Sequence, residues 1–159
     1  MLNMLICPME ESDIETVKAL LIEFYNHLNG LGYSFKLNTA FLDDYVKLQL
    51  DSRLSRIILL KLDGRIAGFV CAGAPMLNKK YLLEGARNIG VISEIYMLPE
   101  FRGRGLAKEL YAAAGEYLKT LGANHVMAEV VENNEASLAL FDSLGFSPFY
   151  SVLIRKLDH

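Results

Sequence analysis

The spacing of apolar residues predicts the first elements of the chain. An apolar run from Leu2 to Cys7 stops at Pro8, which indicates a first strand. Ser12 and Glu15 have the spacing of a capping box, which marks the start of a helix. One helical face follows, with apolar residues three and four positions apart at Ile14, Val17, Leu21, Phe24 and Leu28. Gly30 and Gly32 end this helix.

A second helix and a hairpin follow. Asn38 or Thr39 is the expected cap of the helix, and its inward positions are Leu42, Tyr45 and Leu48. Strands are predicted at 56–62 and 65–74, joined by Asp63-Gly64, a strong two-residue hairpin signal. The stretch 75–88 has no regular pattern.

The second half alternates strands and helices. The expected elements are a central strand at 89–97, a helix at about 104–121, a strand at 124–131, a short helix and a last strand at 149–157. The short helix is capped by Asn133 or Asn134 and ends at Gly145. This order predicts an α/β fold with a mixed, mostly antiparallel sheet and helices on both faces. No linker or repeat interrupts it, so we expect one domain over residues 1–159.

A glycine-rich turn between the central strand and the following helix is the strongest chemical signal. It reads Arg102-Gly103-Arg104-Gly105-Leu106-Ala107. A helix N-terminus carries free N–H groups and a positive dipole end, and glycines let an anion approach the backbone. A dinucleotide fingerprint fails because Lys108 stands where Gly or Ala is needed, and a Walker loop lacks its Gly-Lys-Ser/Thr end. A tight turn with two solvated arginines is the remaining alternative.

Two segments together resemble the GNAT superfamily of N-acetyltransferases. The pattern Arg102-x-x-Gly105-x-Ala107, after a strand and Pro99-Glu100-Phe101, resembles the acetyl-CoA signature of that family. The stretch 134–146, Asn-Glu-Ala-Ser-Leu-Ala-Leu-Phe-Asp-Ser-Leu-Gly-Phe, resembles its second signature. The resemblance covers about residues 90–149. It implies splayed central strands, with the pantetheine arm of acetyl-CoA in the gap between them.

The resemblance also implies a set of cofactor-binding residues. The residues of the glycine-rich turn would hold the pyrophosphate. The backbone N–H groups near Met97 and Leu98 would polarise the thioester carbonyl. The residues of the second signature would line the pantetheine arm. The cofactor-binding candidates are Met97, Leu98, Arg102, Gly103, Arg104, Gly105, Leu106, Ala107, Lys108, Asn134 and Phe141. Lys108 is equally explained as a solvated helix lysine, and Asn134 as a helix cap.

Glu94 is an acidic residue inside the apolar central strand. Side chains alternate along a strand, so Ile92 and Tyr96 are expected on the same face as the carboxylate. An unpaired charge there is costly, and one explanation is an ion pair with a nearby Arg or Lys. The other is a general base acting through water: only a free amine attacks a thioester, and a primary amine with a pKa near 10 is mostly protonated at pH 7. In the resembled family this position often carries such a glutamate.

Phe141 departs from the resembled pattern. The family usually has a tyrosine here, whose hydroxyl assists the departing thiolate. A thiol with a pKa of roughly 8.5 is a tolerable leaving group without that help. Ser137, four residues earlier on the same helical face, is a candidate replacement, as are Tyr150 and a water molecule.

The acceptor site is expected beside the first helix. By resemblance it is walled by that helix, its following loop and the stretch 75–88, and the substrate-binding candidates are Tyr25, Tyr33, Phe35, Glu94 and Tyr96. The mixed aromatic and charged character of this wall favours a small amine, such as a polyamine, aminoglycoside or amino acid, over a basic protein tail. A protein N-terminus remains an alternative.

Composition narrows the function classes further. A net charge of −3 and a pI near 5.6 argue against nucleic-acid binding. No segment has the roughly 20 apolar residues of a membrane helix, and no signal peptide is seen. Cys7 and Cys71 form neither a metal pattern nor a disulfide framework and lack a base partner, so no metal is expected and covalent catalysis is not favoured. These observations predict a cytoplasmic protein.

The sequence therefore predicts an acetyl-CoA-dependent N-acetyltransferase acting on a small amine in a ternary complex. Its catalytic candidates are Glu94, Met97 and Ser137. The alternative is a non-catalytic acyl-CoA-binding or regulatory module, which Phe141 favours and Glu94 opposes. A homodimer through a sheet edge or the last strand fits this pattern.

Overall fold

A five-stranded sheet forms the centre of the molecule. The computed structural model describes residues 1–75, 84–85 and 88–158. The strands lie in the order of the sequence: β1 (Met4–Pro8), β2 (Ser55–Leu62), β3 (Arg65–Gly73), β4 (Ile89–Met97) and β5 (His125–Ala128). The first three pairings are antiparallel and β4–β5 is parallel. The predicted α/β fold with a mixed, mostly antiparallel sheet is confirmed.

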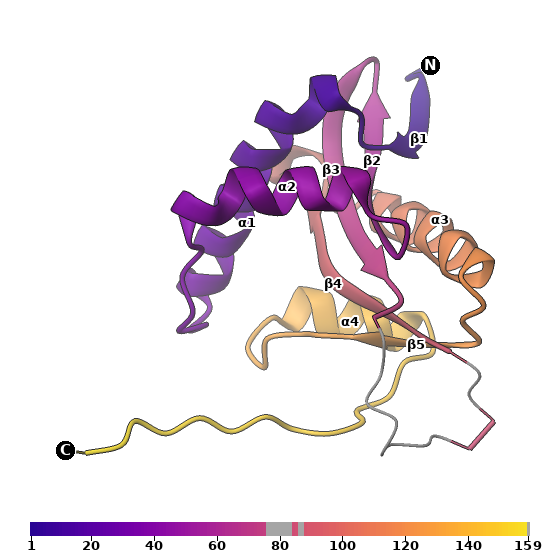
Figure 1. Cartoon of the computed structure of the whole chain (residues 1–159). Coiled ribbons are helices and arrows are strands. Elements are labelled where there is room, and N and C mark those ends of the chain that lie inside the picture. The colour runs from indigo at the N-terminus through magenta and orange to yellow at the C-terminus, as the bar shows by residue number, and fades with distance from the viewer. Residues whose placement is uncertain (76–83, 86–87, 159) are drawn as a thin grey trace.

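Helices cover both faces of this sheet (Figure 1). The α-helices are α1 (Ile14–Gly30), α2 (Leu42–Asp51), α3 (Leu106–Thr120) and α4 (Glu135–Ser143), and three 3-10 turns are η1 (Glu11–Asp13), η2 (Thr39–Phe41) and η3 (Pro99–Phe101). Alternate residues of β2 serve the two layers: Ile57 packs with α1 and α2, and Ile58 packs with α3. Apolar positions of period 2 in the strands and of helical period in the helices therefore build two cores.

Local signals fix most of the element ends. Asp63 and Gly64 have φ values of 47° and 81°, as a type I′ hairpin turn requires, and they join β2 to β3. Asn38 caps η2. The expected capping box at Ser12 and Glu15 is wrong, because Glu10 and Asp13 form it two residues earlier, at the start of η1. Leu48, expected to face inward, is 61% exposed.

A β-bulge in β4 changes the faces predicted for the central strand. Cys71 pairs with Glu94, but its neighbour Ala72 pairs with Ile92, which leaves Ser93 as an extra residue. Ile92 therefore belongs to the core under α3, whereas Tyr96 belongs to the core under α1 and α2. The expectation that Ile92 shares a face with Glu94 is wrong, because the bulge reverses the alternation at this point.

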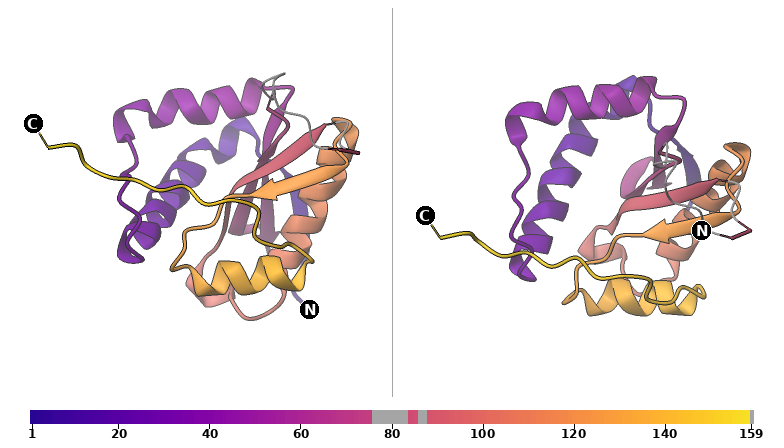
Figure 2. Two further views of the ribbon diagram at one scale, coloured as in Figure 1. Left: turned by 90° about the horizontal axis from the view of Figure 1, so that it is seen from below. Right: turned by 60° about the horizontal axis from the view of Figure 1, so that its bottom comes forward.

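The two parallel strands separate just beyond this bulge (Figure 2). The β4–β5 ladder extends from Ile89↔His125 to Ile92↔Ala128. One further hydrogen bond joins the Glu129 N–H to the Ile92 carbonyl at 3.3 Å. The predicted strand at 124–131 thus ends at Ala128, and the splayed central strands are confirmed.

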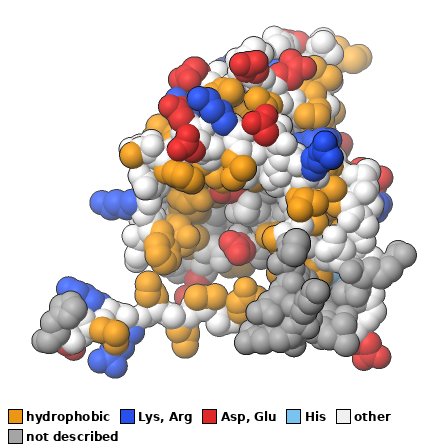
Figure 3. Space-filling view, viewed as in Figure 1, with side chains coloured by type: hydrophobic (Ala, Val, Ile, Leu, Met, Phe, Trp, Pro, Cys, Tyr) orange, Lys and Arg blue, Asp and Glu red, His pale blue; other side chains and the backbone are white. Residues whose placement is uncertain are grey.

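The C-terminal segment does not form the predicted last strand. Residues 147–158 have no helix or strand and are exposed, and they run away from the body of the molecule (Figures 1 and 2). A strand needs a neighbour to take its backbone hydrogen bonds, and this segment has none within its own described chain. The apolar side chains of this segment are therefore exposed instead of buried (Figure 3).

Candidate functional site

Glu94 lies buried at the bulge, within a group of hydroxyls. It is 7% exposed. The Ser93 hydroxyl donates to Oε2 at 2.6 Å, the Tyr25 hydroxyl from α1 donates to Oε1 at 3.0 Å, and the Tyr45 hydroxyl from α2 lies 3.4 Å from both oxygens. No Lys or Arg of the described residues forms an ion pair with it, so of the two explanations that the sequence left open the ion pair is not the one found there. The charge is held by neutral donors.

These donors keep their protons at neutral pH. Burial, reinforced by the charge of Glu94, raises the pKa of Tyr25. Burial, with Cys71 and Glu94, does the same to the pKa of Tyr45. Burial beside Glu94 raises the pKa of the Cys71 thiol to about 12. Cys71 is therefore a protonated neighbour and not a nucleophile.

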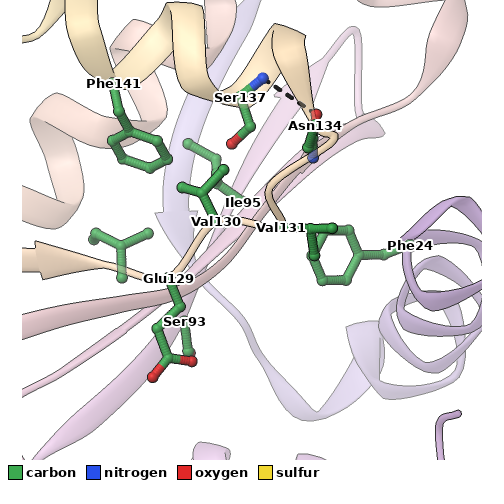
Figure 4. A pocket seen from close by; sticks show the side chains of 10 residues that line it. Phe24, Ser93, Ile95, Glu129, Val130, Val131, Asn134, Ser137 and Phe141 are labelled. Atoms are coloured by element: carbon green, nitrogen blue, oxygen red, sulfur yellow. Dashed lines mark hydrogen bonds between the residues drawn. The ribbon is translucent and has the colours of Figure 1, made fainter. Parts of the chain in front are cut away.

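A pocket opens where β4 and β5 separate (Figure 4). Its volume is about 20 Å³, which is room for about one water molecule. Ser137 and Phe141 both point from α4 towards Val130 on the opposite wall. The lining residues are Phe24, Ile92, Ser93, Ile95, Glu129, Val130, Val131, Asn134, Ser137 and Phe141. Any longer chain that enters this gap must displace side chains.

Three residues of the second signature line this pocket, Asn134, Ser137 and Phe141, and they have different surroundings. Asn134 caps α4 by accepting a hydrogen bond from the Ser137 N–H at 3.2 Å. Phe141 is 4% exposed, and its ring packs edge-on against Phe146. Tyr150 does not line the pocket and is 67% exposed in the C-terminal segment. Ser137 is thus the hydroxyl among the expected acid candidates that lines the gap.

The glycine-rich turn ends in an open helix N-terminus. Gly103 and Gly105 have φ values of 73° and 75°, which glycine adopts without strain. Gly105 is the N-cap of α3 and offers no side-chain cap, so the N–H groups of Leu106 and Ala107 retain their capacity to bind an anion, whereas the Lys108 N–H donates to the Gly105 carbonyl at 3.1 Å. Lys108 is exposed in the same helical turn.

Both arginines of the turn make local contacts. The Arg102 Nε donates to the Met97 carbonyl at 2.9 Å, and its guanidinium lies 5.3 Å from the centre of the Tyr96 ring. The Arg104 Nη2 donates to the Glu100 carbonyl at 3.2 Å. These contacts tie the turn to the end of β4, so the helix N-terminus and the strand end form one unit.

The backbone N–H groups of Met97 and Leu98, at the end of β4, point to opposite sides of the strand. The Leu98 N–H donates to the Ala67 carbonyl of β3 at 2.9 Å, so it is already used. Successive N–H groups of a strand point to opposite sides, and the Met97 N–H therefore points away from β3, towards the side of β5. Of the two expected oxyanion donors, Met97 has the suitable direction and Leu98 does not.

The expected acceptor wall is partly assembled. The ring centroids of Tyr33 and Phe35 lie 5.5 Å apart, and the Asn29 side-chain amide donates hydrogen bonds to the backbone carbonyls of both residues. Asn133, before α4, donates to the Leu31 carbonyl at 3.1 Å and so links the end of α1 to the β5 side. Tyr25 contacts Glu94 directly. Of the stretch 75–88, residues 76–83 and 86–87 lie outside the described residues.

Sequence analysis missed three residues of this site. Ser93 is placed beside Glu94 by the bulge, Tyr45 was expected only as an inward helix position, and Glu129 was expected only as part of a strand. Glu129 is an exposed carboxylate at the pocket (Figure 4). It directly follows Ala128, the last paired residue of the parallel ladder, and the sequence predicted the strand to continue past this point.

The acetyltransferase (GNAT) family model matches residues 19–146. The chain belongs to this family. Membership makes it an acyltransferase, and the two signature segments lie within the matched range. In the described part of the chain, no group of three His, Cys, Asp or Glu residues is arranged to hold a metal ion, and no helix has the length and apolar character to span a membrane.

Relatives of this GNAT protein carry diverse names. An uncharacterized N-acetyltransferase of Archaeoglobus fulgidus is 26% identical over 76% of each chain. N-alpha-acetyltransferase 30 of Schizosaccharomyces pombe is 33% identical over 45% of this chain and 47% of its own. Mycothiol acetyltransferase of Thermobispora bispora is 41% identical over 36% of this chain, and the match spans only 21% of that relative.

Solved structures share the fold at low identity. The aminoglycoside N-acetyltransferase AAC(6')-Iy in complex with CoA superposes with a TM-score of 0.81 at 19% identity, over 99% of this chain and 96% of that one. A mutant of the BH1408 protein from Bacillus halodurans superposes with a TM-score of 0.80 at 19% identity, over 96% of this chain and 99% of that one. The whole arrangement of sheet and helices is thus the GNAT fold.

Proposed function

We propose that residues 1–159 form one domain that transfers an acetyl group from acetyl-CoA to a primary amine of a small molecule. The single observation that carries the proposal is the buried Glu94 carboxylate at the β4 bulge, held by three hydroxyls beside the gap between β4 and β5. A carboxylate kept without a cationic partner retains its capacity to accept a proton from an ammonium group.

In this proposal each part of the site has one task. The open N-terminus of α3 binds the pyrophosphate, and the gap takes the pantetheine arm after its side chains move. Glu94 accepts a proton from the amine, directly or through a water molecule. The amine nitrogen then forms a bond to the thioester carbon while the Met97 N–H donates to the developing oxyanion. The C–S bond breaks and the nitrogen loses its second proton to water or to the departing sulfur, so that the products are the amide and CoA as thiolate or thiol.

Ser137 is our candidate for the proton donor to the leaving sulfur. Its side chain lines the gap from the same helix as Phe141, which has no proton to give. An unassisted departure remains chemically adequate because a thiol pKa is roughly 8.5. We therefore expect Ser137→Ala to lower the rate by much less than the 10²-fold or more that general acid–base catalysis typically contributes.

A cationic small amine fits the charges around the gap. Glu129 lines the gap, Glu94 accepts a hydrogen bond from the lining residue Ser93, and the aromatic pair of Tyr33 and Phe35 follows the end of α1. Among the similar proteins, AAC(6')-Iy is named for aminoglycosides, and one of its solved complexes contains a bisubstrate analogue of CoA and an acetylneamine. We therefore place aminoglycosides and polyamines first among the candidate acceptors, before protein N-termini.

The test begins with calorimetric titration of acetyl-CoA into wild-type protein, Gly105→Glu and Gly105→Ala. Both variants strain a left-handed backbone position, but a Cβ there has no neighbouring atom within 4 Å, so the fold is expected to persist in each. Only Gly105→Glu adds a negative charge at the helix N-terminus. We expect it to weaken binding at least about tenfold relative to Gly105→Ala.

Turnover is then measured by thiol release with aminoglycosides, a polyamine and a peptide with a free N-terminus. Release with an aminoglycoside or polyamine but not with the peptide supports the proposed substrate class. Release with the peptide alone replaces that class by protein N-termini. If wild-type protein does not bind acetyl-CoA, or if both Gly105 variants bind as the wild type does, the proposed cofactor site is wrong.

A further inference from the structure

The side chain of Arg102 lies on the face of the sheet that α1 covers. Its guanidinium is 5.3 Å from the centre of the Tyr96 ring, and Tyr96 belongs to the core under α1 and α2. His27 of α1 contacts the same ring, with 6.3 Å between the ring centroids. Burial lowers the pKa of His27, and the nearby charge of Arg102 lowers it further. The helix that follows the glycine-rich turn, α3, packs on the opposite face of the sheet.

The same side chain holds the backbone at the end of β4. The Arg102 Nε donates to the Met97 carbonyl, and the Leu98 N–H of the same peptide group donates to the Ala67 carbonyl, each at 2.9 Å. This peptide group is thus bonded at both of its polar atoms, and the Tyr96 ring on its other side is covered by the guanidinium. A planar peptide group turns only about the dihedral angles of its neighbours. The direction of the Met97 N–H is therefore restricted from both sides.

β3 restricts this strand end from the side opposite to β5. Gly68 pairs with Met97, and a Cβ at Gly68 would clash with the Met97 sulfur and lie 2.5 Å from the Tyr96 carbonyl oxygen. Only a residue without a Cβ permits so close an approach of the two strands. The end of β4 consequently has no room to shift towards β3, and the Arg102 side chain holds it from the direction of the turn.

We propose that Arg102 is a positioning residue whose side chain orients the Met97 N–H, the oxyanion donor, and does not bind a phosphate of acetyl-CoA. The glycine-rich turn then has two separate tasks. The N–H groups of Leu106 and Ala107 bind the pyrophosphate, and Arg102 acts through Met97 on the reacting carbonyl. A donor that is already directed at the oxyanion needs no reorganisation during the reaction. This inference rests on the proposed function, because it assigns a role in acetyl transfer.

The test compares the wild type with Arg102→Leu, Arg102→Lys and a control. Arg102→Lys keeps the positive charge, which suffices for attraction of a phosphate, but it lacks the planar group that donates from Nε and stacks on the ring. Arg65→Leu is the matched control. Arg65 is also exposed, lies 5.3 Å from the centre of an aromatic ring, that of Phe101, and forms an ion pair with Glu100.

We expect kcat at saturating acetyl-CoA, measured by thiol release, to fall about 10- to 100-fold in both Arg102 variants. Loss of an oxyanion donor typically costs about 10²–10³-fold, and here the donor remains but is less well directed. The dissociation constant of acetyl-CoA, measured by calorimetry, should stay within about threefold of the wild-type value. Arg65→Leu should keep both quantities within about twofold of the wild type.

An NMR titration of His27 locates the guanidinium independently of turnover, with the resonance assigned by its loss in His27→Gln. We expect the pKa of His27 to rise in Arg102→Leu and to stay unchanged in Arg65→Leu, because the charge of Arg102 lowers it in the wild type.

Four results overturn the proposal. They are an acetyl-CoA dissociation constant raised tenfold or more in Arg102→Leu, wild-type kcat in either Arg102 variant, an equal loss of kcat in Arg65→Leu, and an unchanged His27 pKa in Arg102→Leu. A wild type that releases no thiol with any amine overturns the proposed function, and this inference with it. A wild type that turns over while the Arg102 variants keep its kcat overturns this inference alone.

Discussion

Two carboxylates are buried in the described part of the molecule, and they differ in what surrounds them. Asp13 and Glu94 are 8% and 7% exposed. Asp13 accepts from the Lys61 ammonium at 2.8 Å and from the Glu10 N–H at 3.0 Å. Glu94 accepts from the hydroxyls of Tyr25, Tyr45 and Ser93. Burial is therefore equal, and the difference lies in the partners.

This difference separates a structural carboxylate from a reactive one. Burial raises the pKa of Asp13, but the Lys61 ammonium and the Glu10 N–H outweigh it, so the net pKa is lowered. A proton transferred to Asp13 would have to break an ion pair. Glu94 carries a charge that no lysine or arginine among the described residues neutralises, and it lies beside the gap between β4 and β5.

The largest effect is expected from Glu94→Gln. Glutamine has the same shape and can still accept hydrogen bonds from the tyrosines, but it does not take a proton from an amine. We expect kcat/KM for the amine to fall about 10²–10⁴-fold, with little change in thermal stability. Asp13→Asn is the matched control, and its activity should stay within about threefold of the wild type because Asp13 lies outside the gap.

Thiol release at saturating acetyl-CoA measures both variants. Equal losses in the two variants would remove the distinction between the carboxylates. Retained activity in Glu94→Gln together with a large loss in Glu129→Gln would move the base to the exposed carboxylate at the pocket (Figure 4).

An intermediate effect, on stability instead of rate, is expected from Lys61→Met. The variant leaves Asp13 without its cation, and we expect the free energy of unfolding at pH 7 to fall by about 1–3 kcal/mol, between the values for surface and fully buried pairs. Denaturant unfolding measures it. Activity per folded molecule should not change, whereas a parallel loss of activity would mean that the pair also serves the site.

The pH dependence of this pair has a definite sign. The pKa of Asp13 is lowered in the folded state, so its contribution is present above the unfolded value of about 3.9 and is lost as the pH falls through the lower folded value. The hydrogen bond to Asp13 raises the pKa of Lys61, whose contribution is present below about 10.4 and is lost as the pH rises through the higher folded value. The stability difference between wild type and Lys61→Met should therefore be largest between about pH 4 and pH 10.

Sequence reasoning found Glu94 but not its surroundings. A carboxylate inside an apolar run is visible in one dimension, and so are the glycines before α3. The bulge at Ser93 is a property of the β3–β4 pair, and the approach of Tyr25 and Tyr45 depends on how two helices pack on the sheet. The sequence left an ion pair open as one explanation of Glu94 for this reason: the charge of Glu94 was evident, whereas its hydroxyl donors on the helices come from elements far away in the chain.

The ends of the elements show the same division. Alternating apolar residues located the strands, and apolar residues at helical spacing located the helices. This worked because the pattern of each element lies within its own residues. The last strand was predicted from an equally clear pattern at 149–157, but a strand needs a neighbour, and in the described structure this segment is paired with none. The capping box was placed at Ser12 although Glu10 and Asp13 form it, since the spacing alone permits both.

The smallest effect is expected from Tyr25→Phe. The variant removes one of the hydroxyls that hold Glu94 and keeps the ring, which packs edge-on against Phe24 at 5.2 Å between centroids. A hydrogen bond to a charged group contributes about 1.5–3 kcal/mol, but Tyr45 and Ser93 remain as donors, so we expect kcat to fall only about tenfold at pH 7. KM for acetyl-CoA should not change, because α1 does not form the glycine-rich turn.

Tyr33→Phe is the control, since its ring pairs with Phe35 and the hydroxyls that bond to Glu94 come from other residues. A loss in Tyr25→Phe that Tyr33→Phe matches would show that the aromatic wall as a whole sets the rate. A loss confined to Tyr25→Phe would show that the hydroxyls set the reactivity of the Glu94 carboxylate. At Asp13 the charge of Lys61 has the corresponding effect.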